Sequence, residues 1–346
     1  MLHIFDLQHP PRLSSHFYLY QPPPRYCIPS PHKSYHAWLT MIKVAIAGTS
    51  GLSQYIAHYI STQTFHQFIF LSRNNNPGLT AKGWQVLKVD YSNSNNLQYA
   101  LAGIDTVIST ISGEAELALI DAAAHVRVRR FVPSEFEGPP SLCPAANFLD
   151  RGNLTSLARL QYYSQRGMQY AVFACGIFYE RFAPGGMATF QLGSGTYIDG
   201  EGDYLMNVRT MKAEVPYFNA SGAPVFVCMT SAQDLARYIV AALDLPQWET
   251  EYRICGDRMT LGDIVSEAEL MRGVEFEKAI LTDDAIGNAL AHAKASGNLP
   301  QQSRLHCLLA TVAGCYDFGD PNLHTPVHIS PQTFRDWLRS AWAPVL

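Results

Sequence analysis

The most regular pattern along the chain is an apolar run followed by a glycine-rich turn, an amphipathic segment and a second apolar run. Residues 42–47 have the continuous apolar character of a buried parallel strand, and Ile56 and Ile60 are apolar positions at helical spacing. Residues 68–71 predict a second strand, which is followed by Arg73. We therefore expect a strand–turn–helix–strand unit in this part of the chain.

Strand and helix patterns keep alternating after this unit. Further strands are expected over 84–89, 105–111, 130–134 and 170–174, and helices over 97–101, 115–125 and 154–165. Such alternation is typical of a doubly wound α/β fold, in which helices cover both faces of a parallel sheet. Ligands of these sheets bind beyond the carboxyl ends of the strands, where the strand order reverses. Four segments are expected to meet at that edge, namely residues 48–51, 110–113, 133–136 and 176–179.

The composition of the 346-residue chain limits the partners it can have. Hydrophobic residues make up 47% of the chain and charged residues 16%, which suits a packed core. A net charge of −4 and a pI near 6.3 argue against direct binding of nucleic acid. No apolar stretch reaches the roughly 18 residues that a membrane span needs. We expect no interaction with nucleic acid or membrane.

The seven cysteines are scattered singly and form no C-x-x-C pair. Their odd number and their positions in apolar runs are typical of small core residues in a reducing compartment, not of disulfides. The histidines of the predicted helices lack the spacing of metal ligands. We therefore expect a cytoplasmic protein without a metal site.

The turn after the first strand has part of the glycine spacing of a dinucleotide-binding loop. Gly48 and Gly51 frame Thr49 and Ser50, and the glycines let the backbone approach a pyrophosphate at the helix N-terminus. The third glycine position of the pattern holds Gln54. Because that glycine normally lets helix and strand pack closely, we expect Gln54 to push the helix outward or to face solvent.

The residue at the end of the second strand selects the cofactor. An acid there accepts hydrogen bonds from a free ribose 2′-hydroxyl but repels a 2′-phosphate. Ser72-Arg73 occupies this position, so the sequence favours NADP(H) over NAD and over S-adenosylmethionine. The alternative interpretation is an ordinary strand–helix turn that binds no nucleotide, and the arginine makes it less favoured.

The chain is expected to divide into three parts. Residues 1–40 carry seven of the 21 prolines and five of the 12 histidines without any helical or strand period, which predicts a disordered tail. Residues 41–180 form the dinucleotide-binding domain, which also receives later strands. Residues 181–346 form a smaller lobe that closes over the cofactor and holds the substrate. In this lobe we expect a strand over 225–229 and helices over 234–243 and 261–271.

Several motifs resemble a known family. They are VAIAGTSGL with the downstream FLSR, then GIDTVISTISG, RRFVPSEFEGP, CGIFYERFAPGG, TSAQDLARYIVAALDL and ICGDRMTLGDIV. Together they resemble the NmrA-like and isoflavone-reductase-like group of atypical short-chain dehydrogenases, especially its fungal members, from Met41 to about Gly273. RRFVPSEF is the most specific motif, because it follows the fifth strand in that group.

The resemblance implies a Rossmann domain that binds NADP(H) and a smaller C-terminal substrate lobe. It implies a role for each matching position of the loop and the strand ends. Thr49, Ser50, Gly51 and Leu52 would hold the pyrophosphate, Arg73 the 2′-phosphate, Thr110, Ile111 and Ser112 the adenosine side, and Pro133, Ser134 and Phe136 the nicotinamide.

The chain departs from the family at the proton-transfer group. Isoflavone-reductase-like enzymes carry a lysine on the helix after the PSEF loop, but this chain has no lysine between Lys88 and Lys212. The Tyr-x-x-x-Lys pair of ordinary short-chain dehydrogenases is also absent. Hydride transfer still requires a group that supplies or takes a proton. The replacement candidates are Ser134, Tyr179, Glu180 and Lys212.

Each of these candidates has a plainer interpretation. Tyr179 follows the sixth strand, so it is either the proton donor or, with Phe178, a wall of the substrate pocket. Glu180 can act as an acid or form a structural ion pair with Arg181. Lys212 suits a lowered-pKa role if it is buried, although most lysines are solvated.

Three functions follow from these observations. The first is an NADP(H)-dependent oxidoreductase acting on a small, aromatic or polyketide-type metabolite. The second is a non-catalytic NADP(H)-sensing regulator that binds a partner protein, which the missing lysine motivates. The third is a Rossmann-derived isomerase or cyclase without net redox chemistry. A homodimer and a regulatory protein partner both stay open.

Overall fold

The computed structural model describes residues 41–143, 149–150 and 152–345. The expected tail of residues 1–40 lies outside the described residues, as do residues 144–148, which follow the PSEF motif in the sequence, and residues 151 and 346.

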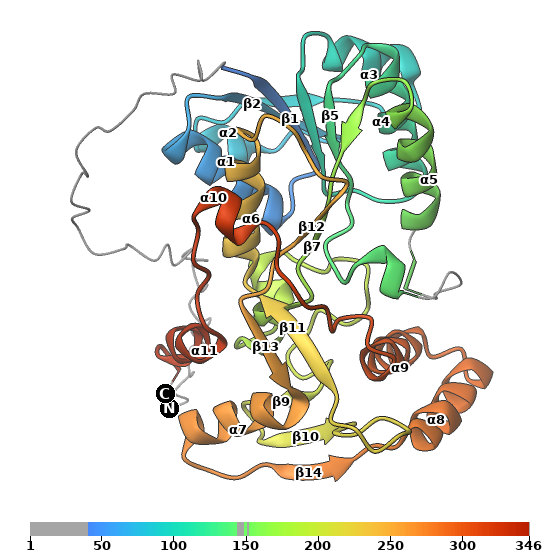
Figure 1. The fold of residues 1–346 in the computed structure, drawn as a ribbon, viewed down its shortest axis with the longest axis vertical. Helices are drawn as coiled ribbons and strands as arrows, with labels where there is room; N and C mark the ends of the chain where they lie inside the picture. Colours follow the sequence, from blue (N-terminus) through green and yellow to red (C-terminus); the bar gives the residue numbers. More distant parts are fainter. Residues whose placement is uncertain (1–40, 144–148, 151, 346) are drawn as a thin grey trace, which may run out of the picture. The chain divides into compact units, whose positions relative to one another are not determined.

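A six-stranded parallel sheet forms the centre of the first half of the described chain (Figure 1). Its strand order is β3-β2-β1-β4-β5-β6, so the order reverses between β1 and β4. This confirms the expected doubly wound Rossmann-type sheet, whose binding edge lies at the carboxyl ends of β1 and β4. The strands are β1 (Lys43–Ala47), β2 (Gln67–Ser72), β3 (Val86–Lys88), β4 (Thr106–Ser109), β5 (Arg130–Val132) and β6 (Gln169–Tyr170).

Helices cover both faces of this sheet because alternate residues of each strand are buried on opposite sides. Val44 and Ile46 of β1 pack into the apolar cluster that contains α1, whereas Ala45 and Ala47 pack into the cluster that contains α4. Figure 1 shows α3, α4 and α5 together on the second face. The helices are α1 (Gly51–Gln63), α2 (Pro77–Ala81), α3 (Ser94–Leu101), α4 (Glu114–His125) and α5 (Asn153–Ser164).

Two elements differ from the expectation. The strand expected over 170–174 is split at Ala171 into β6 and β7 (Val172–Ala174), and β7 pairs in parallel with β12 (Glu251–Arg253). The short helix α2 was not anticipated, although the Asn76 side chain caps its N-terminus and Pro77 occupies its first position.

The later part of the chain contributes to both halves of the structure. Helix α6 (Ala232–Ala242) packs on α1 in the first half. Most of the remaining elements surround a separate apolar core that includes Val227, Leu261 and Leu308, whereas α10 (His324–Val327) packs on α6. The remaining elements are β8 (Ile177–Phe178), β9 (Met206–Asn207), β10 (Lys212–Val215), β11 (Phe226–Thr230), β13 (Asp257–Thr260), β14 (Glu277–Ile280), α7 (Leu261–Arg272), α8 (Asp283–Ala295), α9 (Leu299–Val312), α10, α11 (Phe334–Trp342) and three 3-10 turns, η1 (Pro140–Leu142), η2 (Tyr179–Phe182) and η3 (Met187–Phe190).

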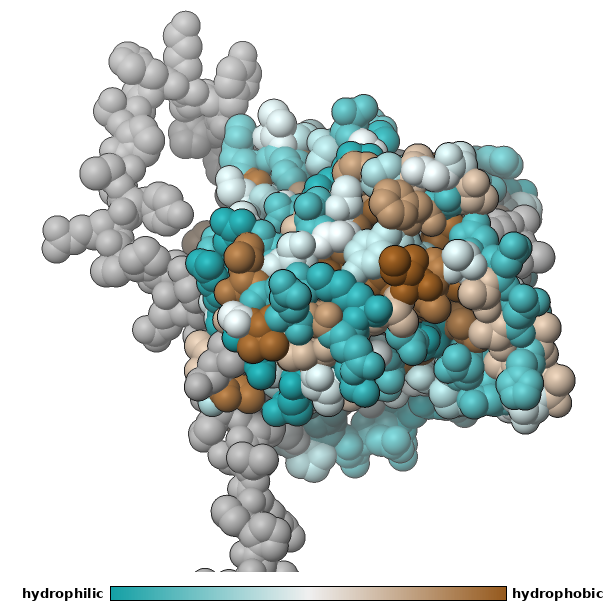
Figure 2. Space-filling model, turned by 90° about the horizontal axis from the view of Figure 1, so that it is seen from below, coloured by the Kyte–Doolittle hydropathy of each residue, from teal (hydrophilic) through white to brown (hydrophobic). Residues whose placement is uncertain are grey.

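Strand β14 lies at the edge of a small sheet in this second half, next to β10. Leu270, Val274 and Ile280 are exposed in this part of the chain, at 69%, 56% and 69%. Figure 2 shows that hydrophobic residues on the face seen from this end are interspersed with hydrophilic ones. Within the described ranges, no helix has both the length and the apolar character to cross a membrane.

Candidate functional site

The turn after β1 is held by a chain of hydroxyl groups. Ser50 Oγ lies 3.1 Å from Ser53 Oγ, which lies 2.7 Å from Thr110 Oγ1. Thr110 Oγ1 donates to the carbonyl of Ala47 at 3.0 Å, so Ser53 donates to Thr110. Gly48 has a φ of 103°, and a Cβ there would collide with Thr110 Oγ1. The loop therefore requires glycine at this position for both backbone conformation and space.

Helix α1 begins directly after this turn and presents its N-terminus to the binding edge. Ser50 caps the helix by accepting a hydrogen bond from the backbone N–H of Ser53 at 3.4 Å. The first turn of the helix carries no acidic residue. Free N–H groups and the helix dipole make such an end favourable for an anion.

Residues 187–199, which we call the strap, lie against this helix end. The backbone N–H of Gly51 donates to the carbonyl of Gln191 at 3.0 Å. A Cβ on Gly51 would overlap the carbonyl oxygen of Phe190, so Gly51 is needed for close approach of the strap. One amide of the expected pyrophosphate loop is thus bonded to another part of the same chain.

Gln54 is buried between α1 and the strap, with only 7% of its surface exposed. Its Nε2 donates to Thr49 O at 3.2 Å and to Gln191 Oε1 at 2.9 Å. Its Oε1 accepts a hydrogen bond from Lys82 Nζ at 2.9 Å. The expectation that Gln54 faces solvent is therefore wrong, because all three hydrogen bonds are made inside the protein.

A cavity of about 580 Å³ opens beside the glycine turn and reaches the end of β2. It brings together most of the predicted phosphate-binding positions, and residues of the strap also line it. Arg73 supplies a positive charge and Asp199 of the strap a negative one. The predicted residues on its lining are Gly48, Thr49, Ser50, Ser72, Arg73, Thr110 and Ile111, and the strap residues are Ala188, Gln191, Leu192, Ser194 and Asp199.

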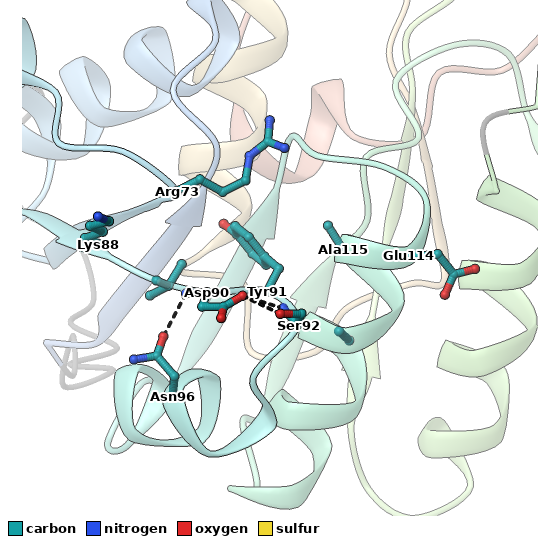
Figure 3. A pocket seen from close by; sticks show the side chains of 10 residues that line it. Arg73, Lys88, Asp90, Tyr91, Ser92, Asn96, Glu114 and Ala115 are labelled. Carbon is teal, nitrogen blue, oxygen red and sulfur yellow. Dashed lines mark hydrogen bonds between the residues drawn. The ribbon is translucent and has the colours of Figure 1, made fainter.

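A second cavity of about 930 Å³ shares Arg73 and Tyr91 with the first. Figure 3 shows Arg73 at the end of β2 close to Tyr91, with Ala115 on α4 across from them. The hydroxyl of Tyr91 donates to Leu71 O at 3.1 Å, which fixes the ring between the two cavities. Small side chains on α4, Ala115 and Ala118, leave the space open.

The sequence reasoning missed several residues of these walls. Lys88, Asp90, Tyr91 and Asn96 follow or end the third strand, so their place at the carboxyl edge was available from the alternation of elements. The strap residues gave no comparable signal, because they lie in a glycine-rich stretch without periodicity.

The remaining predicted cofactor residues do not line either cavity. Leu52 is 4% exposed and Phe136 8%, and both pack into the apolar cluster around α1. Pro133 is buried, while Ser112 and Ser134 are half-buried. Their proposed contacts with a nucleotide stay predictions.

A buried carboxylate positions the PSEF loop. Glu116 on α4 has no exposed surface, and its Oε1 accepts a hydrogen bond from the Ser134 backbone N–H at 2.7 Å. Its Oε2 accepts a hydrogen bond from Ser156 Oγ on α5 at 2.9 Å. The loop after β5 is thus tied to both helices that follow β4 and β5.

Glu135 lies in the same loop and keeps its proton at neutral pH. Burial, together with the neighbouring carboxylates of Glu137, Glu116 and Asp150, raises the pKa of its carboxyl to about 8. A hydrogen bond with Asn153 acts in the opposite direction. A protonated carboxyl group can donate a proton, which is the chemistry that the missing lysine would have supplied.

The structure contradicts the expectation that Tyr179 is a proton donor at the nicotinamide. The side chain has no exposed surface, and it packs against the rings of Phe334 and Trp337. Its hydroxyl donates to Gln332 O at 3.2 Å. A hydroxyl buried in this way contacts the C-terminal segment and not a ligand. Phe178 beside it is half-buried and packs against the apolar cluster around α1.

Lys212 and Glu180 also differ from the expectations. Lys212 is on β10 with 67% of its side chain exposed and lies 3.4 Å from Glu277 Oε2, so the buried, lowered-pKa role is wrong. Glu180 does not pair with Arg181: its Oε1 accepts the backbone N–H of Ala232 at 2.9 Å, while Arg181 donates to Ile198 O. The ion pair was expected because Glu180 and Arg181 are adjacent in sequence, but their side chains extend from the 3-10 turn η2 toward different partners.

Glu180 should make stability fall as the pH rises. The side chain is 1% exposed, and burial raises the pKa of its carboxyl to about 8 from an ordinary value of 4.5. The folded protein therefore retains this proton at pH values where the unfolded chain has lost it, and this stabilisation disappears between those two pKa values. We expect Glu180→Gln, which keeps the acceptor for Ala232, to raise the melting temperature at pH 8 more than at pH 5. An equal change at both pH values would contradict a buried, protonated carboxyl.

No group of three or more metal-ligating side chains occurs among the described residues. The geometry is that of a nucleotide site: a glycine turn, a helix N-terminus, an arginine at the end of β2 and two cavities that share Arg73 and Tyr91 in their linings.

Comparison with known proteins decides the family. The sequence model of the NmrA-like family matches residues 41–290. The chain belongs to the NmrA-like family. The resemblance inferred from the motifs is therefore confirmed, and the match begins where the described residues begin.

One relative in sequence and several solved structures are similar to this chain. The chain is 29% identical over 259 residues to Oxidoreductase BOA1 of Botryotinia fuckeliana (strain B05.10), covering 68% of this chain and 78% of that protein. The structure is similar to AtPrR2 with NADP+ and (+)pinoresinol, with a TM-score of 0.67, 17% identity, and 87% and 99% of the two chains covered. It is also similar to an NADPH-dependent quinone oxidoreductase (QOR2) from Escherichia coli, with a TM-score of 0.65, 16% identity, and 88% and 100% covered. These solved structures share the fold.

Proposed function

We propose that this NmrA-like chain is an NADP(H)-dependent oxidoreductase that acts on a small aromatic or polyketide-type metabolite. The observation that carries the proposal is the cavity that joins the glycine turn and the N-terminus of α1 to Arg73. This combination suits a dinucleotide with a 2′-phosphate, because one end offers backbone N–H groups and the other a guanidinium.

The residues present fit the cofactor. The glycine turn would hold the pyrophosphate, and Arg73 would pair with the 2′-phosphate through charge-assisted hydrogen bonds. The larger cavity beside Tyr91, with the small side chains of α4, has room for the adenosine end. When bound, NADPH supplies a hydride, and the protein orients the ring and controls the proton.

The substrate class is supported by the similar proteins. The curated relative is named an oxidoreductase, and the similar structures include one with (+)pinoresinol and an enzyme named a quinone oxidoreductase. Pinoresinol and quinones are both cyclic, conjugated molecules. We extend this class to the present chain as part of the proposal.

The proton comes from a group other than lysine. Glu135 is the candidate that the described residues support, because its loop carries the predicted nicotinamide contacts and burial raises the pKa of its carboxyl to about 8. Tyr179 and Lys212 are not retained for this role, since one is enclosed in the core and the other is exposed on β10.

A titration of the protein with NADPH and with NADH, in which tryptophan fluorescence is the signal, tests whether NADP(H) is the cofactor. Micromolar binding of NADPH with much weaker binding of NADH is the expected result. A screen of quinones and lignans, with NADPH oxidation as the signal, then tests the reaction. If the protein bound NADPH but turned over none of these compounds, the NADP(H)-sensing regulator would be favoured. The absence of the family's lysine also supports that alternative.

An isomerase or cyclase without net redox chemistry is the second alternative that an observation favours. The N–H of Gly51 is bonded to Gln191, so one amide of the phosphate loop is already used. Failure of the protein to bind either nucleotide would favour this function and overturn the proposed one.

A further inference from the structure

The departure from the glycine fingerprint at Gln54 has a structural counterpart in the strap. Gln54 Nε2 contributes both of its N–H groups to hydrogen bonds, one to Thr49 O and one to Gln191 Oε1, and its Oε1 accepts from Lys82. The carboxamide therefore bonds to the glycine turn, to the strap and to Lys82 at the end of α2, and it is buried from solvent.

Gln191 completes this connection from the other side. Its carbonyl accepts from the Gly51 N–H at 3.0 Å, and its side chain accepts from Gln54 at 2.9 Å. One residue of the strap thus contacts both fingerprint positions of α1, the second glycine and the substituted third. Gln191 also lines the cavity that holds the glycine turn and Arg73.

The backbone of the strap is suited to two positions. Gln191 has a φ of 56°, a left-handed conformation that is unfavourable for a residue with a side chain. Gly186 before the strap and Gly193 within it also have positive φ, at 69° and 72°. Glycines accept large backbone rotations without steric cost. The two hydrogen bonds to α1 offset the strain at Gln191 only while the strap is in contact with the helix.

We propose that Gln54 and Gln191 form a latch that holds the strap over the phosphate loop and slows the release of NADP(H). The proposal rests on the proposed cofactor and adds two positioning residues to it. Because the strap and the glycine turn line the same cavity, a strap held against α1 narrows the exit for a pyrophosphate bound at the turn. Gln54, which replaces the third glycine, thus holds the strap in place. The cofactor leaves when Gln191 has lost its hydrogen bonds to both Gln54 and Gly51.

The dissociation rate of NADPH, measured by stopped-flow displacement, tests the latch. We expect Gln191→Ala, which removes the hydrogen bond to the Gln54 side chain, to raise this rate about fivefold to tenfold. Gln54→Ala also removes the hydrogen bonds to Thr49 and Lys82 and should raise the rate at least as much. The double variant should be no faster than the faster single variant, because both changes remove the same contact. Gln161→Ala, at an exposed position on α5, serves as the control and should leave the rate unchanged.

Hydrogen exchange of residues 187–192 in the cofactor-free protein provides the second readout. Exchange should accelerate in both single variants relative to the wild type and to Gln161→Ala. Unchanged exchange and dissociation rates, or additive effects in the double variant, would overturn the latch. If the wild type binds neither nucleotide, the proposed function fails, and the exchange experiment still tests the contact between Gln54 and Gln191.

Discussion

Arg73→Glu is expected to weaken NADPH binding by roughly 100-fold or more while changing NADH binding only slightly. Arg73 is exposed at the end of β2 and lines both cavities, so its guanidinium is available to a 2′-phosphate. Hydrogen bonds to charged groups contribute about 1.5–3 kcal/mol, and the substitution adds repulsion between the new carboxylate and the phosphate. Fluorescence titration with both nucleotides measures the two dissociation constants.

Lys43→Glu provides the matched control for this change. Lys43 is an exposed residue at the start of β1, at the opposite edge of the sheet, and its replacement alters the net charge by the same amount. If Arg73→Glu weakened both nucleotides equally, or if Lys43→Glu reproduced its effect, Arg73 would not be the 2′-phosphate ligand. Salt dependence offers a further check, because the NADPH affinity of the wild type should fall more steeply with ionic strength than that of Arg73→Glu.

Gly51→Ala should both destabilise the protein and reduce its affinity for NADPH. The added Cβ would overlap the Phe190 carbonyl, so the strap must move away from α1 and the Gly51–Gln191 hydrogen bond must lengthen or break. Overpacking of this kind costs about 1–3 kcal/mol in the free energy of unfolding. Chemical denaturation and nucleotide titration of the same variant measure the two effects.

Gly287→Ala is the control, because it is the same substitution in a different setting. Gly287 lies within α8, and a Cβ there would contact nothing within 4 Å. Replacing a glycine by alanine inside a helix stabilises by roughly 0.5–1 kcal/mol, so this variant should gain stability and keep its affinity. A Gly51→Ala variant as stable as the wild type would show that the strap does not need its contact with Gly51.

The elements that sequence could predict are those whose pattern depends on local spacing. The apolar run, glycine turn and helix around Gly48 and Gly51 have one consistent structural interpretation. The lining residues that belong to this turn could be predicted from it, whereas those of the strap could not. Arg73 lies on the cavity wall, and its place there depends only on where β2 ends; its contact with a 2′-phosphate stays a prediction.

The errors arose where an outcome depends on partners far away in the chain. Gln54 was expected to push the helix outward or to face solvent, because it replaces the glycine that allows close packing of helix and strand. Its side chain instead bonds to Gln191, which lies 137 positions later. Tyr179 was placed at the binding edge by its distance from a strand, yet Gln332, another 153 positions away, receives its hydroxyl. Spacing along the chain cannot report such contacts, because they depend on tertiary packing.

The burial of Arg130 has a consequence for how the protein is made. This β5 side chain is 1% exposed, and its guanidinium donates to the carbonyls of Leu243 and Leu245 just after α6. Synthesis delivers β1 to β5 from the ribosome more than a hundred residues before these acceptors. A nascent chain that stopped short of them would leave a charged group without its partners inside a sheet that also lacks the cover of α6. The half that contains the large parallel sheet is therefore completed only after the chain beyond α6 has been made, because Arg130 and the face covered by α6 take their partners from that segment.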